Sequence, residues 1–263
     1  RPLVVEVSHT FMGVDTVTHP TPVRPAVHYT MGGIASNRST ETTLKGLYVA
    51  GECSSVGIHG ANRLGSNSLS EIVVFGKVAG ESAARYAKAV SESGSSGVRR
   101  QAGAAASRLL ALLDNDRGER VAVLRDEMGD TMEAGVGIYR SATGMQQACD
   151  KLAELRDRYR RGVKLDDKHR AFNTEWLSTI ELGFTLEVAE AMAHSALGRR
   201  ESRGAHVRLD EYKTRDDENF LQHSLATYTG DGPPSISLAP VTITKSKPRT
   251  RSYGGEGKKA VMT

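Results

Sequence analysis

A chain of 263 residues can bury one large hydrophobic core or two ordinary ones, and its 38% hydrophobic and 25% charged residues are typical of a soluble globular protein. The formal charge of +4, from 35 basic and 31 acidic side chains, is too small over this length to indicate a nucleic-acid partner. No run approaches the ~18 consecutive apolar residues that a membrane helix requires, so we expect no direct insertion into a membrane.

The chain contains two cysteines, Cys53 and Cys149, which lie far apart in the sequence. They match none of the spacings that cysteine ligands of zinc or iron adopt. We therefore expect no metal site and a reducing compartment, in which both thiols stay free.

Residues 1 to about 90 are rich in Gly, Thr, Val and Pro and contain short apolar runs that end at glycine or polar turn residues. The runs "PAVHY" at 25–29 and "LKGLYVAGE" at 44–52 are typical of buried strands in an α/β domain. From Ser68 to about Val90 the apolar residues recur at helical spacing. Ser68 and Glu71 have the S-x-x-E spacing of a capping box, which predicts that the helix begins there.

The stretch "SESGSSG" at 91–97 predicts a flexible break. Beyond it, apolar residues at three- and four-residue intervals, with abundant Ala, Leu, Glu and Arg, predict a helical bundle. From about Arg203 the pattern becomes irregular. There, "RDDEN" at 215–219 indicates a turn or cap, "SISLAPVTIT" at 235–244 alternates as a strand does, and the basic end at 245–259 is typical of a frayed tail.

The segment "GIHGANRLGSNSL" at 57–69 concentrates the residues that could carry chemistry. Its glycines allow a ligand to approach the backbone closely, and Arg63 offers a planar fork that suits a carboxylate or phosphate. Ser66, Asn67 and Ser68 stand at a predicted helix start, where unpaired N–H groups favour a negative atom. The same residues would equally suit a capped helix preceded by a solvated loop, and the segment alone leaves both interpretations open.

Two further residues end apolar runs of the kind predicted to be strands. His28 precedes Gly32-Gly33, and Glu52 follows "GLYVAG". Strand ends beside glycine turns are where α/β folds place ligands, and an acidic side chain there can accept a ribose hydroxyl. In the alternative interpretation, His28 is a structural histidine and Glu52 caps the next turn.

These segments resemble a known family in order and almost throughout the chain. "HYTMGGI", "GECSSVGIHGANRLGSNSLSEIVVFGKVAGE", "DEMGDTMEAGVGIYR", "FNTEWLSTIELGFTLEVAEAMAHSALGRRESRGAH" and "RLDEYKTRDDENFLQHSLA" resemble the flavoprotein subunit of fumarate reductases and succinate dehydrogenases. The residues of "MGGI" and "GECSSVGIHGANRLGSNSL" resemble those of the bacterial fumarate reductases more than those of the succinate dehydrogenases.

The resemblance implies an α/β fold followed by helices. Residues 1–26 would be the end of a capping domain and 27–90 the returning, C-terminal part of a Rossmann-like FAD-binding domain. A helical domain would span 91–200, and a small α+β C-terminal domain with a basic tail would span 201–263. The family's G-x-G-x-x-G turn, its flavin-linking histidine and its proton-donating arginine are absent. We therefore expect a C-terminal fragment of a longer polypeptide, inactive and colourless by itself, with no catalytic residue of its own.

The resemblance also implies an FAD-dependent oxidoreductase that transfers hydride to fumarate, giving succinate, in anaerobic respiration. His28 and Arg63 would bind the dicarboxylate. FAD, attached covalently through a histidine upstream, would contact His28, Tyr29, Glu52, Arg63, Leu64, Gly65, Ser66, Asn67, Ser68 and Leu69.

The implied partners are an iron–sulfur subunit and membrane-anchor subunits, which would hold the protein at the cytoplasmic face of the bacterial inner membrane. Three alternatives remain open. The chain could belong to a succinate dehydrogenase, which uses the same site in reverse, or to an L-aspartate oxidase, against which the long C-terminal match counts. It could also act as a non-catalytic helical interaction module through residues 91–200.

Overall fold

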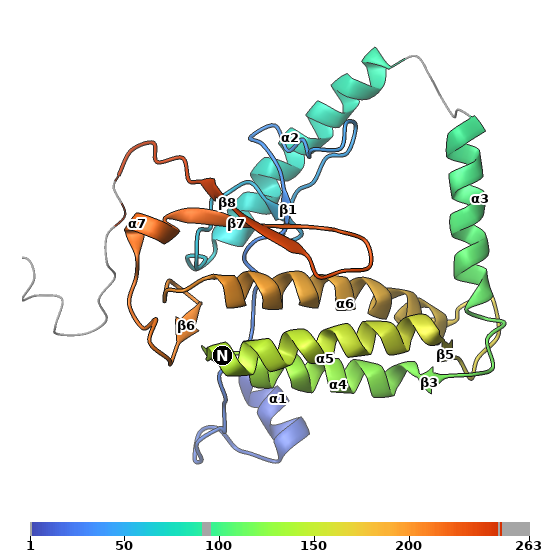
Figure 1. Cartoon of the computed structure of the whole chain (residues 1–263). Helices are drawn as coiled ribbons and strands as arrows, with labels where there is room; N and C mark the ends of the chain where they lie inside the picture. Colours follow the sequence, from blue (N-terminus) through green and yellow to red (C-terminus); the bar gives the residue numbers. More distant parts are fainter. Residues whose placement is uncertain (1, 91–95, 247, 249–263) are drawn as a thin grey trace, which may run out of the picture. The chain divides into compact units, whose positions relative to one another are not determined.

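The computed structural model describes residues 2–90, 96–246 and 248, which divide into two compact units, Arg1–Ala89 and Val90–Thr263 (Figure 1). The first unit contains helix α1 (Pro2–Met12), strands β1 (Ile34–Ala35) and β2 (Ser54–Ser55), and helix α2 (Asn67–Ala89). The second contains the remaining helices and strands. The mixture of helix and strand agrees with the predicted class, whereas the predicted domain boundaries remain a prediction.

The short strands β1 and β2 are joined in parallel, with Ile34 opposite Ser54 and Ala35 opposite Ser55. Gly33 makes this approach possible, because its φ is +140° and a Cβ atom built on it would lie 2.5 Å from the carbonyl oxygen of Cys53. The Ile34 amide donates to that same carbonyl at 2.9 Å. Any side chain at position 33 would therefore push the two segments apart.

The prediction of buried strands at 25–29 and 44–52 is wrong. Residues 25–29 have no regular structure and Val27 is 79% exposed. Within 44–52, Tyr48 forms only an isolated bridge to Glu41. A strand persists only where a neighbour satisfies its backbone N–H and C=O groups. Between residues 2 and 90, the structure supplies only the β1–β2 pair and isolated bridges.

The helix predicted from Ser68 to Val90 is confirmed as α2, which begins one residue earlier. The predicted capping box is wrong, because the buried Glu71 side chain accepts hydrogen bonds from Tyr29 and Ser54 and pairs with His59. Of the apolar residues on this helix, Leu69, Ile72 and Val73 are exposed, whereas Phe75, Val78 and Ala79 are half-buried.

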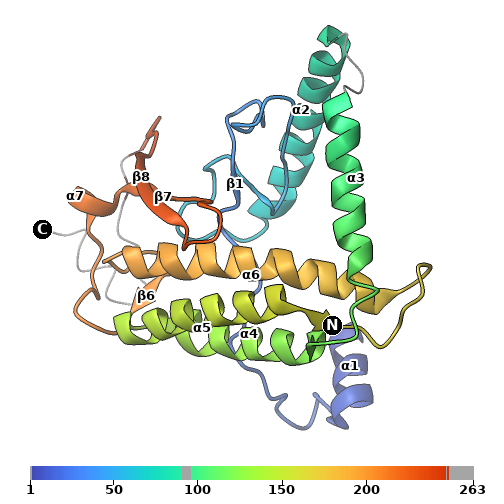
Figure 2. The same ribbon diagram turned by 45° about the vertical axis from the view of Figure 1, so that its right-hand side comes forward.

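The predicted helical bundle is confirmed in the second unit. It consists of α4 (Val121–Val136), α5 (Ala142–Arg161) and α6 (Thr174–Gly198), whereas α3 (Ser96–Ala111) is helical as predicted but has no buried residue. Helices α4, α5 and α6 lie side by side in both views (Figures 1 and 2). Their contact buries the core of this unit, which includes fully buried Leu124, Met145, Leu152, Leu182 and Leu186.

Short parallel pairs join the ends of these helices, and a hairpin follows them. The strand β3 (Glu119–Arg120) pairs with β5 (Val163–Lys164), and β4 (Tyr139–Arg140) pairs with β6 (Val207–Arg208). Next come α7 (Asp217–Phe220) and the antiparallel strands β7 (Gln222–Thr227) and β8 (Ser235–Pro240), with Gln222 opposite Pro240. The hairpin packs on α6 (Figure 1).

Two predictions in this unit are confirmed in part, and two lie mostly outside the described residues. Asp216 caps α7 by accepting a hydrogen bond from the Asn219 amide, as "RDDEN" indicated, and the strand expected at 235–244 covers its first six residues. Most of the break predicted at 91–97 and of the basic tail at 245–259 is not described, although residues 96 and 97 belong to α3 rather than to a break.

A buried network of charged and polar side chains connects α6 to the chain after it. His206 uses Nε2 to donate to the Arg199 carbonyl at 3.1 Å, so Nδ1 accepts from Arg140 Nη1 at 2.8 Å. Burial lowers the pKa of His206 to about 4, and the charges of Arg140, Arg208 and Arg199 act in the same direction. The neutral imidazole is therefore the form that fits this site.

We expect the free energy of unfolding to fall as the pH drops from about 6.5 towards 4. Because the folded-state pKa of His206 lies below its ordinary value of 6.5, its contribution is fully present above that value and declines as the unfolded chain takes up the proton. Urea unfolding of the native protein and of His206→Gln at several pH values measures this. An identical pH dependence in both would contradict the role of His206.

Candidate functional site

The Arg63 side chain is held beside the start of α2 by an aromatic ring. Its guanidinium carbon lies 4.5 Å from the centre of the Tyr29 ring, a cation–π contact. Nη1 donates to the carbonyl of Leu64 at 3.4 Å, whereas Nε is buried and has no partner among the described residues. The guanidinium thus keeps donor capacity that a planar anion could use.

A buried carboxylate lies next to this pair. Glu71, on the second turn of α2, is 2% exposed, and it accepts from the Tyr29 hydroxyl at 3.2 Å and from Ser54 Oγ at 3.4 Å. His59 Nε2 pairs with it as well. Burial, and then the charge and hydrogen bond of Glu71, raise the pKa of Tyr29, so its hydroxyl keeps the proton that it donates.

The two rings around this carboxylate also touch each other. Tyr29 and His59 meet edge to face, with their centroids 5.5 Å apart. His59 Nδ1 is buried without a partner among the described residues. Tyr29 is therefore fixed on its edge by His59, at its hydroxyl by Glu71 and on its face by Arg63.

His28 and Glu52, which were also predicted to bind a ligand, are linked through the backbone to the side chains around Arg63. His28 is exposed and precedes Tyr29 directly, so it stands next to the residue that contacts Arg63. Glu52 is exposed too, and its Oε1 accepts from the Thr30 amide at 2.8 Å. That bond ties the segment after His28 to Glu52 and leaves Oε2 without a hydrogen bond to another described residue.

The start of α2 presents backbone groups rather than a packed surface. Ser66 has a φ of +66°, and its carbonyl accepts from the Leu69 amide at 3.1 Å. The Ser68 amide makes no backbone hydrogen bond to another described residue, so it is free to donate to a ligand. The predicted residues of this stretch are half-buried or exposed, namely Leu64, Gly65, Ser66, Asn67, Ser68 and Leu69.

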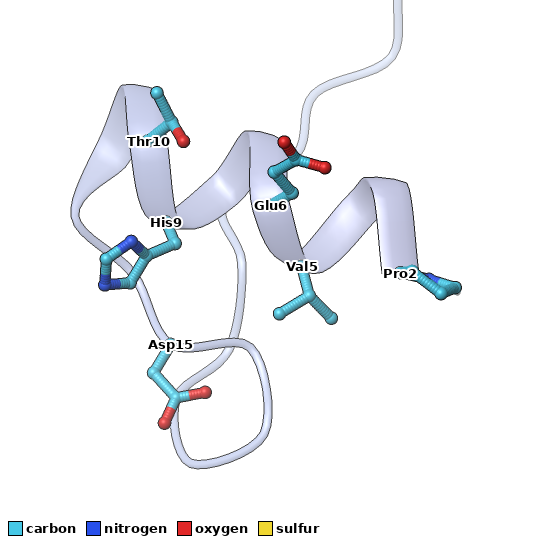
Figure 3. Close-up of a pocket in the computed structure, with 6 residues that line it drawn as sticks. All are labelled: Pro2, Val5, Glu6, His9, Thr10 and Asp15. Atoms are coloured by element: carbon cyan, nitrogen blue, oxygen red, sulfur yellow. The ribbon is translucent and has the colours of Figure 1, made fainter.

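A hollow of about 510 Å³ among the described residues lies elsewhere, on α1 and the turn after it. Figure 3 shows the side chains that line it, namely Pro2, Val5, Glu6, His9, Thr10 and Asp15. None of the residues predicted from the sequence is among them. This hollow and the cluster around Arg63 are thus separate features of the first unit.

Within the described residues, no group of three or more His, Cys, Asp or Glu side chains could hold a metal ion. Over the same part of the chain, no helix is both long enough and apolar enough to cross a bilayer.

The roles of His59 and Glu71 were not predicted from the sequence. His59 is part of the "GIHGANRL" segment but stood there without an assigned role, and Glu71 was assigned to a helix cap. The two residues are twelve positions apart in the sequence, with His59 in a glycine-rich loop and Glu71 on the buried side of a helix. This spacing is the feature of the sequence that could have indicated their contact. Only the folded arrangement shows that Tyr29, from a distant segment, completes the group.

Two family models match the chain. One, described as an FAD binding domain, matches residues 1–69, and the other, described as the fumarate reductase flavoprotein C-terminus, matches residues 125–253. The fumarate reductase flavoprotein subunit of Proteus vulgaris is 53% identical over 97% of this chain, and the match spans 43% of that protein. The succinate dehydrogenase flavoprotein subunit of Coxiella burnetii is 38% identical over 92% of this chain and 42% of its own length.

Solved structures agree with these relatives. A quinol fumarate reductase chain from E. coli matches with a TM-score of 0.91 and 52% identity, over 97% of this chain and 43% of that one. A Mycobacterium smegmatis succinate dehydrogenase matches with a TM-score of 0.79 and 34% identity, over 92% of this chain and 40% of that one. The chain thus spans less than half the length of the relatives that it matches, and over that span it belongs to the family of fumarate reductase and succinate dehydrogenase flavoprotein subunits.

Proposed function

We propose that the chain forms part of the flavoprotein subunit of a fumarate reductase, and that His28 and Arg63 bind the C4 dicarboxylate. The observation that carries this proposal is the guanidinium of Arg63, whose carbon lies 4.5 Å above the centre of the Tyr29 ring and whose buried Nε has no partner among the described residues, beside the start of α2. The identity of 53% with a fumarate reductase subunit, against 38% with a succinate dehydrogenase subunit, favours fumarate reduction.

Arg63 suits this substrate because a guanidinium offers parallel N–H groups to a carboxylate, and such charge-assisted pairs are both stronger and more directional than neutral hydrogen bonds. The exposed imidazole of His28 could donate to the second carboxylate. Together these side chains would orient the dicarboxylate and stabilise the charge that grows on it as the double bond is reduced.

The residues around α2 fit an FAD molecule. The Ser68 amide is an available donor at the positive end of a 23-residue helix, and the second carboxylate oxygen of Glu52 can accept a ribose hydroxyl. Leu64, Gly65, Ser66, Asn67 and Leu69 would complete this face with His28, Tyr29 and Arg63. When bound, FAD supplies the hydride that reduces the alkene.

The finer predictions belong to the same proposal. Residues 1–26 would be the end of a capping domain, 27–90 part of the FAD domain, 91–200 a helical domain and 201–263 a C-terminal domain. An iron–sulfur subunit and membrane-anchor subunits would hold the protein peripherally at the cytoplasmic side of the membrane. Succinate oxidation by the same site is the second candidate, supported by the match to succinate dehydrogenase subunits.

The experiment that tests this proposal is an anaerobic assay of the flavin-loaded holoenzyme, prepared from the longer polypeptide of which this chain would be part, with a reduced dye as electron donor. We expect succinate to form from fumarate, and the reverse reaction, with an oxidised dye as acceptor, to be slower. A faster reverse reaction would favour the dehydrogenase, and no turnover of either dicarboxylate in a flavin-loaded sample would overturn the proposal.

Replacing His28 with alanine should weaken dicarboxylate binding by roughly tenfold, because one hydrogen bond to a charged group is lost. The measurement is KM for fumarate together with the dissociation constant of malonate, which carries two carboxylates but no reducible bond. His19→Ala, which changes another exposed histidine of the same unit, is the control. Unchanged affinity in His28→Ala would remove this residue from the substrate site.

A further inference from the structure

Glu71 is an unusual residue to find buried, and its surroundings explain how it is tolerated. Taking a carboxylate out of water costs several kcal/mol unless hydrogen bonds and an opposite charge offset the loss. Here Tyr29 donates to one oxygen at 3.2 Å, Ser54 to the other at 3.4 Å, and His59 Nε2 forms a further hydrogen bond with the carboxylate. These partners come from separate segments, so the carboxylate fixes them relative to α2.

Arg63 is held mainly by Tyr29, which is one of the partners of Glu71. Its only hydrogen bond to another described residue is the long one to the Leu64 carbonyl, at 3.4 Å, and Nε has none. The Tyr29 ring, 4.5 Å away, is thus its principal support. A guanidinium stacked on a ring keeps its N–H groups in the plane, where a carboxylate can meet them.

We propose that Glu71, paired with His59, is a positioning residue that orients Tyr29 so that its ring presents the Arg63 guanidinium to the dicarboxylate. This inference rests on the proposed function, because it takes Arg63 as a substrate-binding group. Glu71 and His59 touch neither substrate nor flavin in this scheme. They act through the hydroxyl and the edge of the Tyr29 ring.

The test uses the flavin-loaded holoenzyme and malonate as the probe, with binding followed by the change in flavin absorbance. Tyr29→Leu removes the platform and should weaken malonate binding at least tenfold. Tyr29→Phe and Glu71→Gln keep the ring but remove or weaken its anchor, so each should weaken binding by about threefold to tenfold. KM for fumarate should rise by a similar factor in each, with a smaller change in kcat.

A double substitution separates positioning from general damage. In an Arg63→Ala background, Tyr29→Phe and Glu71→Gln should have no further effect on malonate binding, because the group they orient is gone. If Arg63→Ala weakens binding but the Tyr29 and Glu71 variants do not, or if their effects simply add to it, the positioning role is wrong. If Arg63→Ala itself binds malonate normally, the proposed function fails instead.

The first unit offers a matched control of the same chemistry. The Tyr48 hydroxyl donates to Glu41 at 3.4 Å on an exposed part of the surface, and neither residue is assigned to the site. Tyr48→Phe and Glu41→Gln should therefore leave malonate affinity and KM unchanged. An effect there equal to that of Tyr29→Phe and Glu71→Gln would show that any tyrosine–glutamate pair of this unit matters, and would contradict the specific role of Glu71.

Discussion

Replacing Arg63 with lysine should lower fumarate reduction by about a hundredfold or more while FAD stays bound, because lysine keeps the charge but not the planar fork. An ammonium cannot form two parallel hydrogen bonds to one carboxylate, and it stacks less well on the Tyr29 ring that supports Arg63 at 4.5 Å. The measurement is kcat/KM for fumarate, with the flavin absorbance as the test for retained cofactor.

Arg38→Lys is the matched control, since Arg38 is an exposed arginine of the same unit outside the predicted site. Its kcat/KM should stay at the native value. Normal turnover in Arg63→Lys would take Arg63 out of the substrate site. Loss of flavin together with loss of turnover would instead assign it to the cofactor.

Helices were the most predictable part of this protein. Apolar residues at three- and four-residue spacing in 96–198 indicated a bundle because a helix must bury one face, and α4, α5 and α6 do so against each other. Strands in 1–90 could not be predicted in the same way. A run such as 25–29 has the composition of a strand, but pairing depends on a neighbour that composition does not reveal.

The same difference applies to the site: some of its residues can be predicted from their neighbours in the sequence, and others only from contacts with distant segments. Arg63 could be singled out from its own neighbourhood, because a guanidinium among glycines before a helix is chemically suggestive. Glu71 could not, since its spacing from Ser68 matches a capping box equally well. The true partners, Tyr29 and Ser54, lie 42 and 17 residues away along the chain.

Replacing Glu201 with glutamine should destabilise the second unit by roughly 3 kcal/mol or more, because breaking a buried ion pair leaves uncompensated charge behind. Glu201 is fully buried, and its Oε1 accepts from Arg199 Nη1 and Arg203 Nε, each at 2.7 Å. Its Oε2 accepts from Arg203 Nη2 at 2.9 Å and from the Asp216 amide at 2.8 Å. Glutamine would retain one acceptor oxygen and place an amide donor against a guanidinium.

Urea unfolding of the native chain and of Glu201→Gln measures this effect, with Glu211→Gln, at an exposed glutamate ten residues on, as the control. The Asp216 amide bond links Glu201 to the cap of α7, so the loss should extend to that turn. Faster amide exchange at Asn219, whose N–H the Asp216 side chain accepts, would report it. A loss below about 1 kcal/mol would mean that solvent reaches the arginines, and the network would then count as an ordinary surface cluster.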